Sequence, residues 1–315
     1  MTGLQLSVIV PTYNRAAGVA RALVSILDQT ASCDRYEILV VDNNSTDNTA
    51  EVVDDFVRRS NGRIRRLLET RQGVAYARQA GIDAARAGIL AFFDDDVSVS
   101  RSWVETILQT FDEHPDIEVI GGKVLPQWAT PPPRWLTRAH WSPLALQDFG
   151  DRPELMSIDN PRALISANLA CRRQVFDRLG GFSPVFQRVK DGIGSLEDDE
   201  WIRRLWKSGG RGLYVPELVA FTEVPPSRLT HAYHRRWHQG HGRFYALLRA
   251  EEMERTSIGS FCGVPAHMYR AAFRHIMGCV GALLIGRSDL AFLHEVQLRF
   301  FAGFCGQRFV ERRYP

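Results

Sequence analysis

Short, almost uninterrupted apolar runs alternate with helical patterns through the first 125 residues, and this alternation constrains the fold more than any other feature. Leu6–Val10, Glu37–Val41 and Ile89–Phe93 have the length and composition of strands, and segments with helical spacing of apolar residues separate them. Strands without a polar face, joined by helices, are typical of a parallel sheet covered on both sides. The pattern predicts an α/β protein with a mostly parallel, Rossmann-like sheet and helices on both faces.

The alternation stops at residues 126–161, which contain seven prolines and the tryptophans Trp128, Trp135 and Trp141. Long irregular loops are often functional, so Trp135 is a candidate for contact with a substrate. Regular structure resumes after this loop, and the pattern is helical from Arg228 onward. We therefore expect a sheet domain at residues 1–225, with the loop inside it, and a helical extension at residues 226–315.

The five cysteines are scattered and form no C-x-x-C pair, which argues against a disulfide framework and a structural zinc site. The N-terminus lacks the charged and apolar pattern of a signal segment, and the apolar run Ile276–Ile285 is too short to span a bilayer. We expect a cytoplasmic protein. The net charge of +3 is small, but basic residues gather in the C-terminal third, which favours contact with the inner face of a membrane.

Acidic residues follow the predicted strands. Asp42 comes directly after one strand, Asp94, Asp95 and Asp96 come directly after another, and a third acidic site begins at Glu197. Ligands of open α/β sheets bind beyond the carboxyl ends of the strands. Adjacent carboxylates repel one another unless a cation lies between them, and their oxygens suit Mg²⁺ or Mn²⁺. The sequence therefore predicts a divalent metal that neutralises substrate phosphates.

Each acidic segment also has a purely structural explanation. Asp42 suits a turn in which its side chain accepts a backbone hydrogen bond. The triple aspartate precedes a helix and could cap it. The run Glu197–Glu200 could complement the dipole of the helix that it begins.

Six segments of the chain, taken together, match the characteristic segments of one known protein family. In order they are SVIVPTYNR, VVDNNSTDNT, GVAYARQAG, FFDDDV, SANLACRR and LEDDEWIRRLWKSG. The chain resembles the family 2 glycosyltransferases, which have the A-type nucleotide-diphospho-sugar transferase fold, and the resemblance covers roughly residues 5–225. It implies transfer of a sugar from a nucleotide diphosphate, most commonly a UDP-sugar, to a hydroxyl acceptor, with inversion at the anomeric carbon.

The resemblance also implies roles for single residues. Pro11, Thr12 and Tyr13 would line the nucleobase and ribose, Asp42 would hydrogen-bond the base, and Arg78 would lie near the nucleotide, with Asp95 beside it. Asp94 would meet the ribose or the sugar, and Asp96, together with Asp94, would hold the metal. Asp198 would be the catalytic base. The family's base lies in an E-D-x-D-L-x-x-R segment, and Arg204 falls at the position of its arginine, which aligns Asp198 with the base.

One departure concerns a histidine that many relatives use to ligate the metal or contact the diphosphate. Thr222 stands in its place here. Glu223, His231 and His234 are candidates for that contact. Further candidates for acceptor or diphosphate contacts are Asn168, Glu197 and Trp135.

The implied partners are a nucleotide-diphospho-sugar donor and a glycan or lipid-linked acceptor, as in glycolipid or polysaccharide assembly; no nucleic acid is expected. A haloacid-dehalogenase-type phosphatase is the alternative enzyme, since its signature also ends a strand in Asp-x-Asp. A non-catalytic sugar-nucleotide binder is the alternative outside enzymes. The C-terminal apolar segments Tyr269–Ile285 and Leu290–Phe304 suit either a peripheral membrane contact or packing, including a homodimer interface.

Overall fold

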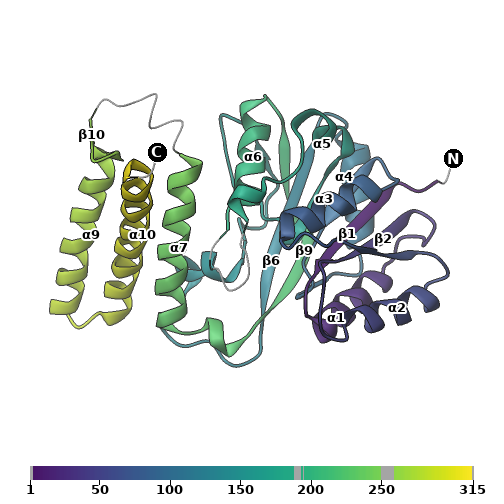
Figure 1. Cartoon of the computed structure of the whole chain (residues 1–315), viewed down its shortest axis with the longest axis horizontal. Coiled ribbons are helices and arrows are strands. Elements are labelled where there is room, and N and C mark those ends of the chain that lie inside the picture. Colours follow the sequence, from purple (N-terminus) through teal and green to yellow (C-terminus); the bar gives the residue numbers. More distant parts are fainter. Residues whose placement is uncertain (1–2, 188–192, 194, 250–258, 314–315) are drawn as a thin grey trace. The chain divides into compact units, whose positions relative to one another are not determined.

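The computed structural model of the 315-residue chain describes residues 3–187, 193, 195–249 and 259–313. Its contacts divide the chain into two compact units: residues 1–127, 145–187 and 197–223 form the first, and residues 128–144, 188–196 and 224–315 form the second. The first unit contains the sheet and the second contains the C-terminal helices (Figure 1). Part of the proline-rich excursion, residues 128–144, thus groups with the helices.

One sheet organises the first unit. In the described residues its strands are β1 (Leu6–Thr12), β2 (Tyr36–Asp42), β3 (Ile64–Leu68), β4 (Ile89–Phe92), β5 (Val97–Val99), β6 (Val119–Trp128), β7 (Glu154–Met156), β8 (Leu169–Arg172) and β9 (Gly212–Val224). Their order is β3-β2-β1-β4-β8-β6-β9-β5, with β7 beside β9. The pairings from β3 to β4 are parallel. Beyond β4, β8 is antiparallel to both β4 and β6, and β9 is antiparallel to β5 and β7.

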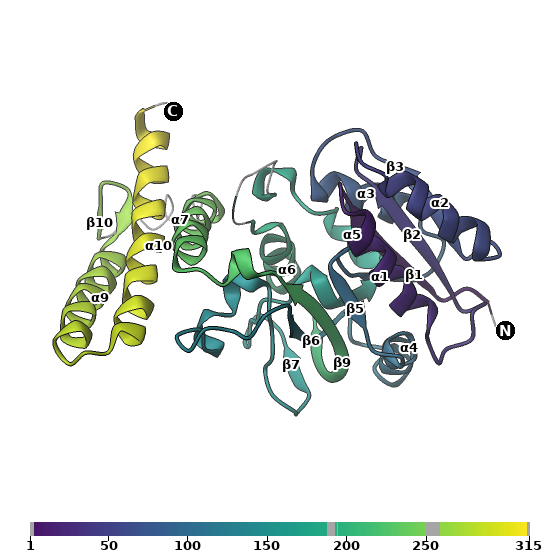
Figure 2. The ribbon, with the colours of Figure 1, turned by 90° about the horizontal axis from the view of Figure 1, so that it is seen from below.

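Helices cover both faces of this sheet (Figure 2). They are α1 (Ala16–Leu27), α2 (Thr49–Arg59), α3 (Val74–Ala84), α4 (Trp103–Glu113), α5 (Arg173–Leu179) and α6 (Glu197–Lys207). Val8 and Val10 pack with α1, α2 and α4, whereas Ile9 packs with α3 on the other face, which α5 and α6 also cover. Successive side chains of a strand point to opposite faces, so a strand buried on both needs a continuous apolar run. The predicted α/β class, with helices on both faces, is confirmed.

Short 3-10 turns complete the connections: η1 (Arg138–His140), η2 (Ser142–Leu144), η3 (Ser166–Asn168), η4 (Pro184–Phe186) and η5 (Pro226–Arg228). Two of them, η1 and η2, lie in the excursion that the prolines mark. Strand β7 lies there as well, so this region has more regular structure than the sequence predicts.

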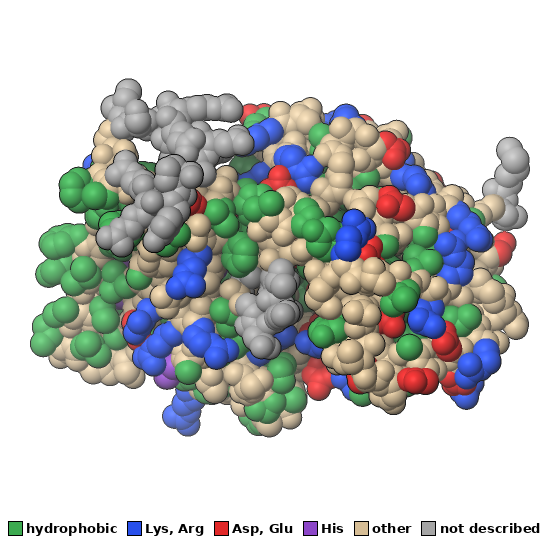
Figure 3. Space-filling model, viewed as in Figure 1, with side chains coloured by type: hydrophobic (Ala, Val, Ile, Leu, Met, Phe, Trp, Pro, Cys, Tyr) green, Lys and Arg blue, Asp and Glu red, His purple; other side chains and the backbone are tan. Residues whose placement is uncertain are grey.

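The second unit is built from α7 (His231–Leu248), α9 (Ala266–Leu284) and α10 (Ser288–Arg313), with a small hairpin of β10 (Ser260–Phe261) and β11 (Val264–Pro265). Helix α10 packs against both α7 and α9. Glycines allow the backbones of α7 and α10 to approach closely. A Cβ at Gly242 or Gly303 would collide with a carbonyl of the facing helix. Apolar side chains lie on the surface over α9 (Figure 3). Within the described residues, no helix combines the length and apolarity needed to cross a bilayer.

Candidate active site

The parallel pairing of β1 and β2 sets the first edge of the site. Pro11 lies opposite Val41 and Thr12 opposite Asp42, so the residues that follow both strands emerge side by side. Thr12 is buried, and the next residue, Tyr13, is 42% exposed. The carboxyl ends of these strands therefore present one aromatic ring to solvent beside a buried acid, an arrangement that suits a planar ligand such as a nucleobase.

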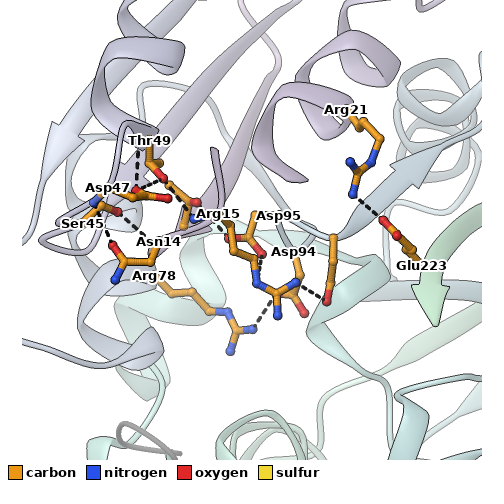
Figure 4. Close-up of polar contacts among 12 residues, drawn as sticks. Asn14, Arg15, Arg21, Ser45, Asp47, Thr49, Arg78, Asp94, Asp95 and Glu223 are labelled. Carbon is orange, nitrogen blue, oxygen red and sulfur yellow. Dashed lines mark hydrogen bonds and ion pairs between the residues drawn. The ribbon is translucent and has the colours of Figure 1, made fainter. Parts of the chain in front are cut away.

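Asn14 ties the two loops beyond these strands together (Figure 4). Its Oδ1 accepts a hydrogen bond from the Thr46 backbone N–H at 2.7 Å, and its own N–H donates to the Ser45 hydroxyl at 3.0 Å. Asn14 has a φ of 50°, in the left-handed region that asparagine tolerates better than most residues. Asn14 is not among the site residues that the sequence indicates, although asparagine between a strand and a helix is a recognisable turn signal.

Asp42 is buried and accepts a hydrogen bond from the Ser45 backbone N–H at 2.9 Å through Oδ1. Its Oδ2 lies 3.7 Å from Nη1 of Arg66. The turn explanation of Asp42 is thus present in the structure. The turn hydrogen bond occupies Oδ1 of Asp42, so Oδ2 is the oxygen that could contact a ligand.

The three aspartates after β4 point in different directions. The Thr12 hydroxyl donates to Asp95 Oδ2 at 2.8 Å. Asp94 pairs with Arg78 at 3.1 Å and Asp96 with Arg15 at 2.9 Å (Figure 4). Burial raises the pKa of Asp94, and it raises that of Asp95 to about 7, although arginines oppose both shifts. Three carboxylates crowded in a poorly hydrated site favour either protons or added cations.

Arg78, at the buried face of α3, connects two of the acidic segments. Its Nη2 lies 3.1 Å from Asp94, and its Nη1 donates to Glu197 at 2.8 Å. Among the described residues, Nε of Arg78 and Oε2 of Glu197 are buried and have no hydrogen-bond partner. Buried polar atoms are nearly always paired, so these two atoms point to a ligand or ordered water at this place.

Asp198, the predicted base, lies at the start of α6 beside Glu197. Its Oδ2 accepts from the backbone N–H of Ser166 at 3.2 Å and from the Ser166 hydroxyl at 3.3 Å. Its Oδ1 accepts from the N–H of Asp199 at 2.9 Å. Burial, followed by the charge of Glu197, raises the pKa of Asp198 to about 7. The carboxylate is therefore held in one orientation and titrates near neutral pH, as a general base requires.

Arg204, which set the register on Asp198, anchors the same helix. It pairs with Glu200 at 2.6 Å, and its Nη2 donates to the carbonyl of Gly181 at 2.6 Å. Arg204 thus holds α6 against the segment that follows α5. Among the described residues, its hydrogen bonds do not include one to Asp198.

The carboxylates near Asp94 suit an open metal site better than a closed one. Within the described ranges, no three His, Cys, Asp or Glu side chains converge to enclose a cation. Mg²⁺ typically binds one or two carboxylates and takes its other ligands from water and substrate phosphates. The donor set of Asp94 and Asp96 fits such an ion, because the diphosphate of a substrate would complete its shell.

Thr222, which replaces the expected histidine, lies on β9 opposite Val97 of β5. The next residue, Glu223, donates its backbone N–H to the carbonyl of Asp96 at 3.1 Å. Its side chain forms an ion pair with Arg21 (Figure 4). The pairing of β5 with β9 thus brings the Glu223 backbone to the triple aspartate, while its carboxylate is already engaged by an arginine.

Three residues that the sequence suggests as acceptor or diphosphate contacts, Asn168, His231 and His234, have structural partners instead. Asn168 is fully buried; its amide donates to the carbonyls of Lys123 and Leu218 and accepts from the Trp103 indole at 2.7 Å. Its hydrogen-bonding capacity is used within the core, so we assign it no acceptor contact. His231 and His234 lie in the second unit, where their rings pack against Trp135 with centroids 4.3 and 5.1 Å apart. Burial lowers the pKa of His234 to about 4, which describes a neutral packing residue.

Comparison with known proteins identifies the family of the chain. The family described as Glycosyl transferase family 2 matches residues 7–180. The glucosyl-dolichyl phosphate glucuronosyltransferase of Haloferax volcanii is 25% identical over 218 residues, which cover 67% of this chain and 66% of that protein. Glycosyltransferase AglE of the same organism is 29% identical over 70% of this chain and 67% of its own length. The chain thus spans about two thirds of the length of these relatives.

Solved structures share the fold at low sequence identity. The mannosyltransferase PcManGT of Pyrobaculum calidifontis, in complex with GDP-Man and Mn²⁺, has a TM-score of 0.59 at 19% identity over 93% of this chain and 86% of its own. S. aureus TarS 1–349 in complex with UDP has a TM-score of 0.57 at 16% identity over 99% and 92%. The family match spans more than half of the chain, and the chain therefore belongs to the family 2 glycosyl transferases.

Proposed function

We propose that the protein transfers a sugar from a UDP-sugar to a hydroxyl acceptor, with inversion at the anomeric carbon. The supporting observation is the Arg78 bridge, because one guanidinium joins Asp94 to Glu197, the neighbour of Asp198. The acids assigned to the donor and the acid assigned to the acceptor proton thus lie around one buried guanidinium, whose charge acts on Asp94, Glu197 and Asp198. A haloacid-dehalogenase-type phosphatase would leave the acidic and arginine-bearing segment Glu197–Lys207 unexplained, and its signature belongs on a first strand, whereas Asp94 follows β4.

The donor would lie over the loops after β1, β2 and β4. Pro11, Thr12 and Tyr13 would border the base and ribose, with Asp42 accepting a hydrogen bond from the base. UDP is favoured because the structurally similar TarS was solved with UDP. GDP donors are the alternative, since PcManGT was solved with GDP-Man. Asp94 and Asp96 would hold Mn²⁺ or Mg²⁺, which neutralises the charge that develops on the leaving diphosphate.

Asp198 would take the acceptor proton. As the acceptor oxygen forms its bond to the anomeric carbon, the bond from that carbon to the diphosphate breaks, and the hydroxyl proton passes to Asp198. Ser166 keeps the carboxylate in place for this transfer through its N–H and its hydroxyl. Attack opposite the leaving group inverts the anomeric carbon, and no covalent enzyme intermediate is required.

The acceptor is a glycan or a lipid-linked sugar. The relative named for glucosyl-dolichyl phosphate supports a lipid-linked acceptor, with the protein at a membrane surface. A homodimer is the competing explanation for the apolar surface of the second unit. Trp135 is retained as a candidate acceptor contact, because its side chain is only partly buried.

A panel of UDP-, GDP- and dTDP-sugars, each with Mn²⁺ and a polyprenyl-diphosphate-linked sugar, tests the proposal. We expect nucleoside diphosphate release from UDP donors and a product whose anomeric configuration, read by NMR, is opposite to that of the donor. Absence of both donor binding and release with every sugar nucleotide would point to a different activity. Phosphate release from sugar phosphates would restore the phosphatase alternative.

A further inference from the structure

Helix α9 carries six large apolar side chains on its outside. Phe273, Met277 and Leu284 are 63%, 55% and 82% exposed, and the full stripe consists of Phe273, Ile276, Met277, Val280, Leu283 and Leu284. At 3.6 residues per turn these positions span an arc of about 120°, so they form one continuous band along the helix. We call this band the α9 stripe; it is visible as apolar surface over α9 in Figure 3.

Most residues on the inner side of α9 have small side chains. Ala272 and Ala282 are its buried residues, and a Cβ at Gly278 would collide with the His294 ring of α10. A surface helix of a globular protein normally buries its large apolar residues and exposes polar ones. Near the start of α9, Met268 and Tyr269 also pack inward, and the Tyr269 ring lies 5.4 Å from that of Phe301 on α10. Farther along, α9 turns small residues toward α10 and leaves the six residues of the α9 stripe uncovered, so packing within the second unit does not account for the stripe.

The charges around the α9 stripe indicate whether it faces a second copy of the chain or a lipid surface. Residues 259–288 contain no Asp or Glu, whereas Arg270 and Arg274 are exposed beside the stripe. In a dimer of two α9 stripes, these arginines would find no acid on the facing helix. An anionic lipid surface offers phosphates to the arginines and acyl chains to the apolar residues at the same time.

We propose that the α9 stripe docks the protein onto an anionic membrane, with α9 lying in the interface. The helix has 19 residues, so it lies along roughly 28 Å of surface at 1.5 Å per residue. Phe273, Met277 and Leu284 enter the acyl boundary, and Arg270 and Arg274 stay at headgroup level. This deepens the proposed function by naming the surface where a lipid-linked acceptor is met, but membrane binding itself does not depend on transfer activity.

Co-sedimentation with vesicles of phosphatidylglycerol and phosphatidylcholine tests the docking without donor or acceptor. The full chain should bind mixed vesicles at low salt, and binding should weaken at least tenfold with pure phosphatidylcholine or with high salt. Phe273→Ser with Met277→Ser and Leu284→Ser should abolish binding. Arg270→Gln with Arg274→Gln should remove the preference for anionic lipid.

A matched control replaces Val24 and Leu155 by Ser, since both are more than half exposed and lie in the first unit. This control should bind like the unchanged protein. Equal binding by the triple serine variant, or no binding of the unchanged chain to anionic vesicles, would overturn the proposal. A lipid-free dimer in size-exclusion chromatography that the triple variant converts to monomer would show that a second copy covers the stripe. Nucleoside diphosphate release in detergent, measured in parallel, reports separately on the proposed function.

Discussion

The guanidinium of Arg15 lies 2.9 Å from a carboxylate oxygen of Asp96 and 3.6 Å from one of Asp95, where the sequence predicts a metal ion. Arg15 thus serves as a resident cation for the triple aspartate (Figure 4). A divalent ion that takes Asp96 has to displace this ion pair. The Arg15 side chain is 39% exposed, so the pair is screened and contributes on the order of 1 kcal/mol or less.

Arg15→Gln should therefore tighten Mn²⁺ binding to the donor-free protein by roughly two- to fivefold, which corresponds to the loss of such a pair. The signal of free Mn²⁺ in electron paramagnetic resonance measures this directly. Arg101→Gln is the control, because Arg101 makes the same kind of ion pair with Asp28. Equal Mn²⁺ affinity in all three proteins would show that Arg15 does not compete with the metal.

Metal removal should stop the reaction. With excess chelator, release of UDP should fall to background and return on addition of Mn²⁺ or Mg²⁺, because the leaving diphosphate carries charge that needs a counter-ion. Asp96→Asn should remove the increase in UDP affinity that Mn²⁺ produces, measured by calorimetry. Full turnover in chelator would mean that Arg15 and Arg78 alone neutralise the diphosphate.

Asp198→Asn should lower transfer by roughly 10²- to 10⁴-fold, the usual cost of losing a general base, while UDP-sugar affinity stays close to normal. The asparagine oxygen still accepts from Ser166, whereas the amide nitrogen cannot take a proton and no longer accepts from the Asp199 N–H. Asp199→Asn is the matched control, because Asp199 pairs with Arg203 on the same helix at 2.8 Å. An inactive Asp199 variant beside an active Asp198 variant would reverse the assignment.

Local sequence patterns predict the parallel half of the sheet and the acids at its edge. Asp42 and Asp94 each follow an apolar run, and such runs form strands whose ends meet at one edge. The antiparallel half depends on pairings between distant segments, such as Val97 with Thr222, which no local period encodes. For that reason the sequence does not reveal that the Glu223 backbone meets Asp96.

Individual side chains also escape prediction when their partners are distant. The SANLACRR segment suggested a ligand role for Asn168, but three groups from β6, β9 and α4 saturate its amide. In the sequence, nothing distinguishes Arg15 from other residues between a strand and a helix. Its ion pair with Asp96 becomes apparent only in the structure. Sequence pattern locates the elements that carry a site, whereas three-dimensional contacts decide which side chains are available in it.

Burial of acids makes the folded protein sensitive to pH in a defined direction. The pKa values of Asp95 and Asp198 are raised from 3.8 to about 7. Between these values the folded protein retains protons that the unfolded chain releases, so stability falls as pH rises through this window. The decrease in Tm from pH 5 to pH 8 should be smaller in Asp198→Asn than in the unchanged protein. Asp159→Asn, at an exposed position, should leave the decrease as it is; an equal effect of both variants would contradict the assignment.

Asp42 has two roles to separate, because its carboxylate both closes a turn with Ser45 and lies at the expected base site. Asp42→Ala should weaken UDP binding by roughly 1–3 kcal/mol, the cost of leaving a buried hydrogen-bonding group of the ligand or the protein unpaired. It should also lower Tm, since the Ser45 N–H loses its acceptor. Asp42→Asn keeps an oxygen for Ser45 but replaces the oxygen near Arg66 with a donor, so it should lower Tm less than Asp42→Ala does while still weakening UDP binding. Calorimetry with UDP and thermal unfolding on both variants distinguish these effects. If Asp42→Asn binds UDP as tightly as the unchanged protein, Asp42 is a turn residue and the base is recognised elsewhere.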